Sequence, residues 1–321
     1  MNPEPSLLET KDFLFIIGSP RSGTTMLQIL LAAHPQVAST VEQTLFQHYV
    51  KQWLDTWDAE VRNIEERGWK LGLPILWKEE ELVAFLREFL ARAYAKILAL
   101  KPGATHLLDK HPGYSAHVRT IKRFLPRARF IHIIRDGRDV AASTVAAHAK
   151  MGFGPANVAG AAVKWRRFLR AARDAAQFGE DYLEIRYEQF LESKVDVYAR
   201  VLGFCGLSAT AEWISEIVDA NTFDKMKERG ASPDPTTKLS EKRYHRGTAG
   251  GWLHDLSAWD RFQFDQLAGD LLCELGYAQP GWWAESAGDR LALPLRHQWE
   301  KRRCLLRRLT DDARNFLRGY E

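Results

Sequence analysis

The sequence predicts an α/β fold in which a parallel β-sheet is flanked by helices on both faces. Two observations predict it: short apolar runs alternate with helical patterns between residues 13 and 185, and a glycine-rich turn follows the first run. Strands that alternate with helices form right-handed βαβ units, whose parallel sheet is covered on both sides. Ligands of such sheets bind at the carboxyl ends of the strands, so the chemistry is expected there.

The composition is that of a globular protein. Of its 321 residues, 45% are hydrophobic and 27% are charged, which excludes disorder and a collagen-like chain. No run of about 18 apolar residues is present, so no transmembrane segment is expected. The cysteines Cys205, Cys273 and Cys304 have neither paired nor metal-ligand spacing. We expect reduced thiols, no metal site and a cytoplasmic location.

The expected elements follow in chain order. A buried strand at Phe13–Ile17 leads through the glycine-rich turn to a helix at Thr24–Ala33, and a long amphipathic helix covers Glu79–Leu100. Three further strands and one further helix are predicted at Thr105–Leu108, Arg129–Ile134, Tyr182–Ile185 and Arg261–Gly276. The segment from Asn221 to Gly251 has little apolar periodicity and is expected to be a surface loop or a lid.

The charge is concentrated in the C-terminal tail. Residues 290–321 hold nine Lys or Arg against four Asp or Glu, whereas the whole chain carries +4. A nucleic-acid enzyme spreads positive charge over its working face, so no nucleic-acid partner is expected. We predict one domain over residues 1–277 and a basic, helical extension over 278–321. The apolar stripe of this extension would contact its own domain, a second subunit in a homodimer, or an anionic surface.

The strongest motif is FIIGSPRSGTT at residues 15–25. A strand, a glycine-bounded loop and a helix start place backbone N–H groups around one point at the positive end of a helix dipole, which is a P-loop-like site for a phosphate or sulfate. Thr24 stands where nucleotide triphosphatases have the lysine that reaches the β- and γ-phosphates. The loop residues expected to bind the ligand are Ser19, Arg21, Ser22, Gly23, Thr24 and Thr25.

This loop resembles the phosphosulfate loop of sulfotransferases that use 3′-phosphoadenosine 5′-phosphosulfate (PAPS). It is most similar to the tyrosylprotein sulfotransferase-like branch, which has arginine at the position of Arg21. A second motif, FIHIIRDGRDVAAS at residues 130–143, resembles the family's 3′-phosphate site. The resemblance implies that Arg135 and Ser143 bind the 3′-phosphate, that PAPS is the donor and PAP the product, and that no metal is required.

A third motif, HRGTAGGW at residues 245–252, is similar to R-K-G-x-x-G-x-W of the cytosolic enzymes. The resemblance implies that Arg246 and Gly247 close over the nucleotide. Because His245 stands where the family has arginine, Arg243 is expected to supply that charge. Tyr187, which follows the strand that ends at residue 185, matches a family position near the nucleotide.

Sulfuryl transfer needs cations at the leaving oxygen and a base for the acceptor proton. The candidate cations are Arg21 and Lys110, and Lys110 stands in DKHP, which resembles the branch's N-K-D-P lysine. Two bases remain open. Glu42 lies 21 residues after Arg21, as the branch's catalytic glutamate does, and His111 partly matches the cytosolic enzymes' K-x-H-L-P.

The resemblance implies a sulfotransferase that acts on the hydroxyl of a small-molecule, carbohydrate or phenolic acceptor, whose identity no pattern in the sequence specifies. Two alternatives remain. A small-molecule kinase would share the phosphate loop but needs a loop lysine and a magnesium-binding acid at a strand end. Asp136, the candidate acid, follows an arginine instead. A non-catalytic protein that binds nucleotides or anionic surfaces would not need Glu42 or Lys110.

Overall fold

The computed structural model describes residues 6–222, 224–225, 248–300 and 302. Its centre is a five-stranded, all-parallel sheet of order β2-β3-β1-β4-β5, so the predicted α/β fold is confirmed. The strands are β1 (Asp12–Ile17), β2 (Val37–Ser39), β3 (His106–Lys110), β4 (Arg129–Ile134) and β5 (Tyr182–Arg186). The four predicted strands correspond to β1, β3, β4 and β5, and the short strand β2 was not predicted.

Helices and helical turns connect the strands. Those that precede β4 are α1 (Leu7–Thr10), α2 (Thr24–Ala33), the π-helical turn η1 (Leu45–Val50), α3 (Lys51–Arg67), η2 (Leu73–Ile75), α4 (Glu79–Ala99), η3 (Pro112–Ala116) and α5 (Val118–Phe124). Those that follow β4 are α6 (Gly137–Met151), α7 (Val158–Arg173), η4 (Asp174–Asp181), α8 (Tyr187–Glu192), α9 (Lys194–Cys205), α10 (Ala211–Ala220), α12 (Trp252–Asp255) and α13 (Ala258–Glu274).

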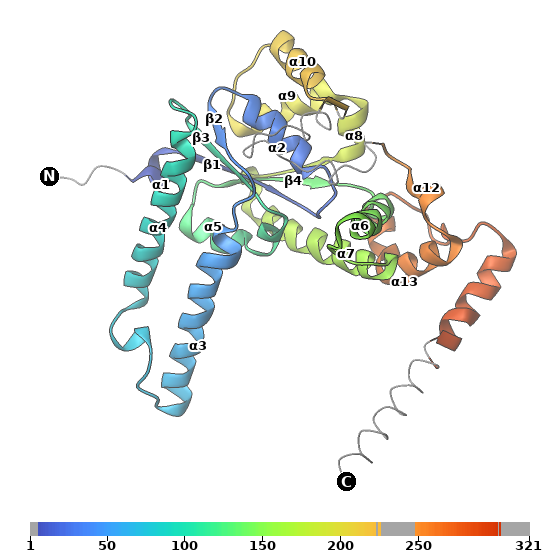
Figure 1. The fold of residues 1–321 in the computed structure, drawn as a ribbon, viewed down its shortest axis with the longest axis horizontal. Coiled ribbons are helices and arrows are strands. Elements are labelled where there is room, and N and C mark those ends of the chain that lie inside the picture. The colour runs from blue at the N-terminus through green and yellow to red at the C-terminus, as the bar shows by residue number, and fades with distance from the viewer. Residues whose placement is uncertain (1–5, 223, 226–247, 301, 303–321) are drawn as a thin grey trace, which may run out of the picture.

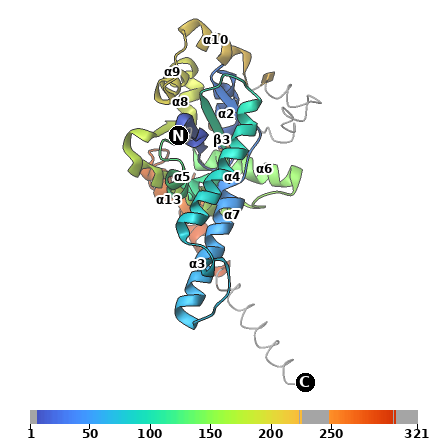
Figure 2. The same ribbon diagram turned by 90° about the vertical axis from the view of Figure 1, so that its left-hand side faces the viewer.

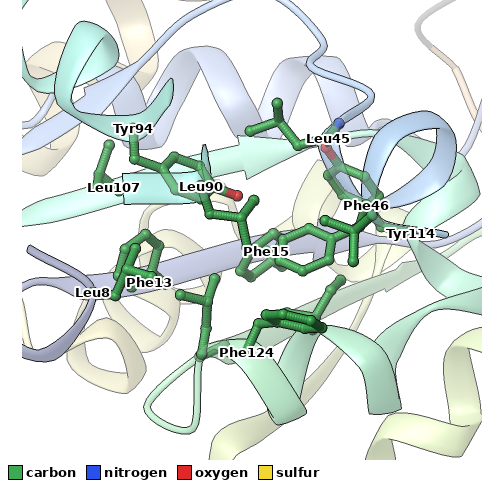
Figure 3. Packing of buried hydrophobic residues seen from close by; sticks show 14 of the residues in the cluster. Leu8, Phe13, Phe15, Leu45, Phe46, Leu90, Tyr94, Leu107, Tyr114 and Phe124 are labelled. Atoms are coloured by element: carbon green, nitrogen blue, oxygen red, sulfur yellow. Dashed lines mark hydrogen bonds between the residues drawn. The ribbon is translucent and has the colours of Figure 1, made fainter. Parts of the chain in front are cut away.

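Both faces of the sheet are covered, which explains why β1 is a continuous apolar run rather than an alternating one. Leu14 and Ile16 point to the face covered by α2, α8, α9 and α10, the upper layer in Figure 1. Phe13 and Phe15 point to the opposite face, where they meet rings from α4 and η3 (Figure 3). The carboxyl end of β1 is thereby fixed between two packed layers.

Helices α3 and α4 reach well beyond the sheet in both views (Figures 1 and 2). Trp53 of α3 packs against Phe85 of α4, and Tyr49 of the preceding turn η1 packs against Phe89, with ring centroids 5.3 and 5.6 Å apart. Phe85 lies on the apolar side of α4 and is still 40% exposed. The reason is that this part of α4 has α3 rather than the sheet as its neighbour.

The C-terminal part of the described chain packs on α13. Trp283 and His297 contact Phe262 of that helix, and residues 287–300 are helical. The division after residue 277 stays a prediction, and most of the basic tail, with its predicted partners, lies outside the described residues. Within the part of the chain that the structure describes, no helix is long and apolar enough to cross a membrane.

Candidate functional site

The phosphate loop connects the end of β1 to the start of α2. Three of its residues have positive φ: Gly18 (+137°), Arg21 (+73°) and Gly23 (+97°). A side chain at Gly23 would place its Cβ 2.6 Å from the Tyr187 ring, and one at Gly18 would collide with the Ile133 carbonyl at the same distance. Both glycines are therefore required by the close approach of the loop to its surroundings, and not by the turn alone.

The structure brings four of the predicted donor-binding residues together. Arg21 Nε donates to Ser143 Oγ (3.0 Å), and Arg135 Nη1 donates to the carbonyl of Arg21 (3.1 Å). The Arg135 guanidinium also lies over the Tyr187 ring, 4.5 Å from its centroid. Burial raises the pKa of Tyr187, against the opposing effect of the Arg135 charge. Residues 21, 135, 143 and 187, which are far apart in sequence, thus form one surface beside the loop.

Two polar atoms on this surface have no hydrogen-bond partner among the described residues. Ser22 Oγ and Arg135 Nε are both buried and unpaired. Such atoms cost free energy unless a ligand or water satisfies them. A hydroxyl in the phosphate loop and a guanidinium N–H beside it are the groups that phosphate oxygens pair with. The residues present therefore fit the phosphate groups of PAPS.

The chain before α12 is held against the start of α6. Asp139 accepts hydrogen bonds from the backbone N–H groups of Gly250 (2.8 Å) and Trp252 (2.9 Å), and Arg135 donates to the Thr248 carbonyl (2.9 Å). Asp139, in the first turn of α6, was not predicted from the sequence, because its partners lie more than 110 residues further along the chain. The predicted nucleotide contacts of Arg243, Arg246 and Gly247 lie outside the described residues.

The predicted transfer residues meet on the α2 side of the sheet. Lys110 Nζ donates to Glu42 Oε1 (2.5 Å) and to Thr25 Oγ1 (3.2 Å), and the lysine side chain is only 1% exposed. A buried ammonium group needs such partners, and the carboxylate provides the strongest of them. Thr25, the second residue of α2, thus links the phosphate loop to the lysine at the end of β3.

His111 faces the same carboxylate through one ring nitrogen. His111 Nε2 lies 3.9 Å from Glu42 Oε2, while Nδ1 accepts a hydrogen bond from the Gly113 N–H (3.1 Å). Because Nδ1 is the acceptor, the hydrogen of the neutral ring lies on Nε2. Burial lowers the pKa of His111, so the neutral form is favoured. The nitrogen that faces Glu42 is therefore a donor in this form, without a free lone pair for a proton.

Two other loop residues and one neighbour have more local roles. Ser19 Oγ donates to the next carbonyl, that of Pro20, and Thr24 is buried at the start of α2. Ser115, which was not predicted from the sequence, accepts a hydrogen bond from the Gly18 N–H (3.0 Å) and so fixes the entry to the loop.

In the described parts of the chain, no group of three or more His, Cys, Asp or Glu is arranged to hold a metal ion.

Most of the similar proteins found by comparison are named as sulfotransferases. A sequence model described as the sulfotransferase family matches residues 13–211. A putative protein-tyrosine sulfotransferase of Caenorhabditis briggsae is 24% identical over 232 residues, which cover 69% of this chain and 76% of that protein. Nodulation protein NoeE of Sinorhizobium fredii is 25% identical over 300 residues, 85% of this chain and 68% of that protein. The match to zebrafish protein-tyrosine sulfotransferase 1 (26% identical) covers 56% of this chain but 48% of that protein.

Solved structures share the fold. Mouse sulfotransferase SULT7A1 complexed with PAP superposes with a TM-score of 0.50 at 17% identity, over 83% of this chain and 89% of that one. The sulfotransferase domain from the curacin biosynthetic pathway gives 0.51 at 17% identity, over 84% and 99%. The family match spans more than half of the chain and includes the phosphate loop, the motif at residues 130–143 and Lys110. The sequence-based assignment and the enzyme class are thus confirmed, and the chain belongs to the sulfotransferase family.

Proposed function

We propose that this protein transfers the sulfuryl group of PAPS to a hydroxyl group of a small-molecule, carbohydrate or phenolic acceptor. The observation that carries the proposal is the contact of Lys110 with both Glu42 and Thr25. It joins a buried cation, a carboxylate and the phosphate loop at one point. Cations beside a leaving oxygen and a base beside the acceptor are what group transfer of this kind requires.

The donor would be held by the phosphate loop and the surface beside it. The unpaired Ser22 hydroxyl and Arg135 N–H support this assignment, as does the Arg21–Ser143 contact. When bound, PAPS supplies a sulfuryl group on a phosphate leaving group. The protein's part is to hold Arg21 and Lys110 beside the oxygen on which negative charge develops. One such donor contributes on the order of 10²–10³ in kcat in other enzymes.

Glu42 is the better candidate base. Its carboxylate has two oxygens, one bound to Lys110 and one directed to His111, and the side chain is 31% exposed, so an acceptor can reach it. His111 in its neutral form points an N–H at the same place. In this arrangement Glu42 takes the acceptor proton, and Lys110 and His111 orient the carboxylate. We also propose that the enzyme is cytoplasmic and that its thiols are reduced. Cys205 and Cys273 are free in the structure, as this proposal requires.

The test uses ³⁵S-labelled PAPS with three acceptor probes: 2-naphthol, a chito-oligosaccharide and a tyrosine peptide. Glu42→Gln is expected to lower kcat on the best acceptor by about 10²–10⁴-fold, because it removes the base but keeps the shape. The matched variant His111→Gln also places a glutamine amide at the site, and its kcat should fall by less than about 10-fold. Both should bind PAP with the affinity of the wild type. Equal losses, or a larger loss in the histidine variant, would move the base to His111. A wild type that labels none of the three probes would contradict the proposed function.

A further inference from the structure

A buried polar cluster lies beneath the transfer site, on the opposite face of the sheet from Lys110. Its centre is Asp109, the preceding residue of β3, which therefore points the other way. Its Oδ2 accepts from Tyr94 (3.1 Å) and contacts the Tyr114 hydroxyl (3.0 Å). All three side chains are buried, and the proposed mechanism uses none of them.

Tyr114 connects this cluster to the segment that carries Glu42. Its hydroxyl donates to the carbonyl of Gln43 (2.5 Å) and accepts from the N–H of Leu45 (3.1 Å). The ring is fixed in the core by edge contacts with Phe15 and Phe46, and Figure 3 shows it beside Leu45 and Phe46. The backbone on both sides of residue 44 is thus bonded to one immobile oxygen. Glu42 is the residue immediately before this anchor.

A count of hydrogens shows what Asp109 contributes. A tyrosine hydroxyl has one hydrogen and two acceptor sites. If the hydrogen goes to Gln43, then the contact of Tyr114 with Asp109 Oδ2 needs a hydrogen from the aspartic acid. Asp109 Oδ1 has no partner among the described residues, which is costly for a carboxylate and much less so for a neutral acid. Burial raises the pKa of Asp109 to about 7, so its neutral form is populated near neutral pH.

We infer that Tyr114 is a positioning residue of the transfer site: it fixes the backbone of residues 43–45 from inside the core and so sets where Glu42 meets Lys110. In its neutral form, Asp109 donates to Tyr114 and leaves the tyrosine hydrogen for the Gln43 carbonyl. The inference rests on the proposed role of Glu42. The anchoring itself does not depend on that role, so the two can fail separately.

The test compares two single-hydroxyl deletions. Tyr114→Phe removes the bonds to residues 43 and 45, whereas the control Tyr94→Phe removes a hydroxyl bonded to the same carboxyl oxygen but to no atom of that segment. We expect Tyr114→Phe to lower kcat on the best acceptor by about 10- to 100-fold with unchanged PAP affinity. Tyr94→Phe should change kcat by less than about 3-fold. Equal effects of the two variants on kcat would overturn the inference.

Hydrogen exchange gives a second readout that needs no acceptor. Amides in a peptide that spans residues 40–47 should exchange faster in Tyr114→Phe and at the wild-type rate in Tyr94→Phe. Asp109→Leu should behave like Tyr114→Phe, and Asp109→Asn, whose amide can donate, should lose less activity than Asp109→Leu. Unchanged exchange in Tyr114→Phe would overturn the inference. Faster exchange with a wild type that transfers nothing would support the anchor and contradict the proposed function.

Discussion

Lys110 and Asp109 are neighbours at the end of β3, and their side chains lie in different environments on opposite faces of the sheet. Lys110 points to the α2 side, where Glu42 and Thr25 surround its ammonium group. Asp109 points into an aromatic core with two tyrosine hydroxyls. Successive side chains on a strand face opposite ways, so a cation and a neutral acid can lie one residue apart without pairing.

The protonation of Asp109 makes a prediction about stability. Its pKa is about 7 in the folded chain, against an ordinary value of 3.8. Between these two pH values the folded chain keeps a proton that the unfolded chain has lost. The free energy of unfolding therefore loses up to about 1.4 kcal/mol per pH unit as the pH rises through this window. The contribution is complete below about pH 4 and absent above about pH 7.

Asp109→Asn isolates this effect, because it cannot titrate and leaves every other group in place. Urea unfolding of both proteins between pH 5 and pH 8 measures the difference in free energy of unfolding. We expect the wild type to lose stability relative to the variant up to about pH 7 and then to run parallel to it. The buried His132 and His106, whose pKa values burial lowers, have the opposite slope but cancel in the difference. A difference that is independent of pH would mean that Asp109 is ionised throughout.

At the scale of elements, the proposed donor site depends on the approach of α2 to the start of α8. Gly23, the N-cap of α2, has φ +97°, and an added Cβ would lie 2.6 Å from the Tyr187 ring, which in turn supports Arg135. Gly23→Ala is expected to weaken PAP binding at least about 10-fold and to destabilise the fold by roughly 1–3 kcal/mol. Calorimetric titration with PAP and urea unfolding measure the two effects.

Gly68→Ala is the matched control. Gly68 ends α3 with φ +66°, and an added Cβ there would meet no atom within 4 Å. It should cost about 1 kcal/mol in stability for the left-handed backbone and leave PAP affinity unchanged. If both variants bind PAP equally well, the contact between the phosphate loop and Tyr187 does not shape the donor site.

Local patterns in the sequence predicted the elements that depend on local chemistry. β1, the phosphate loop and α2 were predicted because the strand, turn and helix signals are adjacent in the chain. The pairing of Arg21 with Ser143 was predicted only as a shared ligand site, and the direct bond between them appears in the fold. β2 has three residues, too few for a periodic signal. The anchoring of Trp252 by Asp139 joins residues 113 apart in sequence, which no local pattern indicates.

For the whole molecule, the site is a junction of segments from across the chain, between residue 18 at the end of β1 and the segment at 248–252. They lie together because β1, β3 and β4 end at the same carboxyl edge of a parallel sheet, and because the segment at 248–252 is bonded to Arg135 and Asp139, which follow β4. A cleft of about 450 Å³ between α3, η2 and α4, lined in part by Trp53, Trp57 and Leu73, lies on the helices that follow Glu42 in the chain. The net positive charge of the chain comes mainly from the C-terminal extension and not from the residues at the carboxyl edge of the sheet.

The central claim is that the phosphate loop binds PAPS, and isothermal titration calorimetry with PAP tests it most directly. The same protein is titrated with PAP and with ATP, each in EDTA and in magnesium. The account predicts magnesium-independent binding of PAP and much weaker binding of ATP, because Thr24 replaces the lysine that triphosphate sites use. Tight binding of ATP only with magnesium, and weak binding of PAP, would contradict it and favour a kinase.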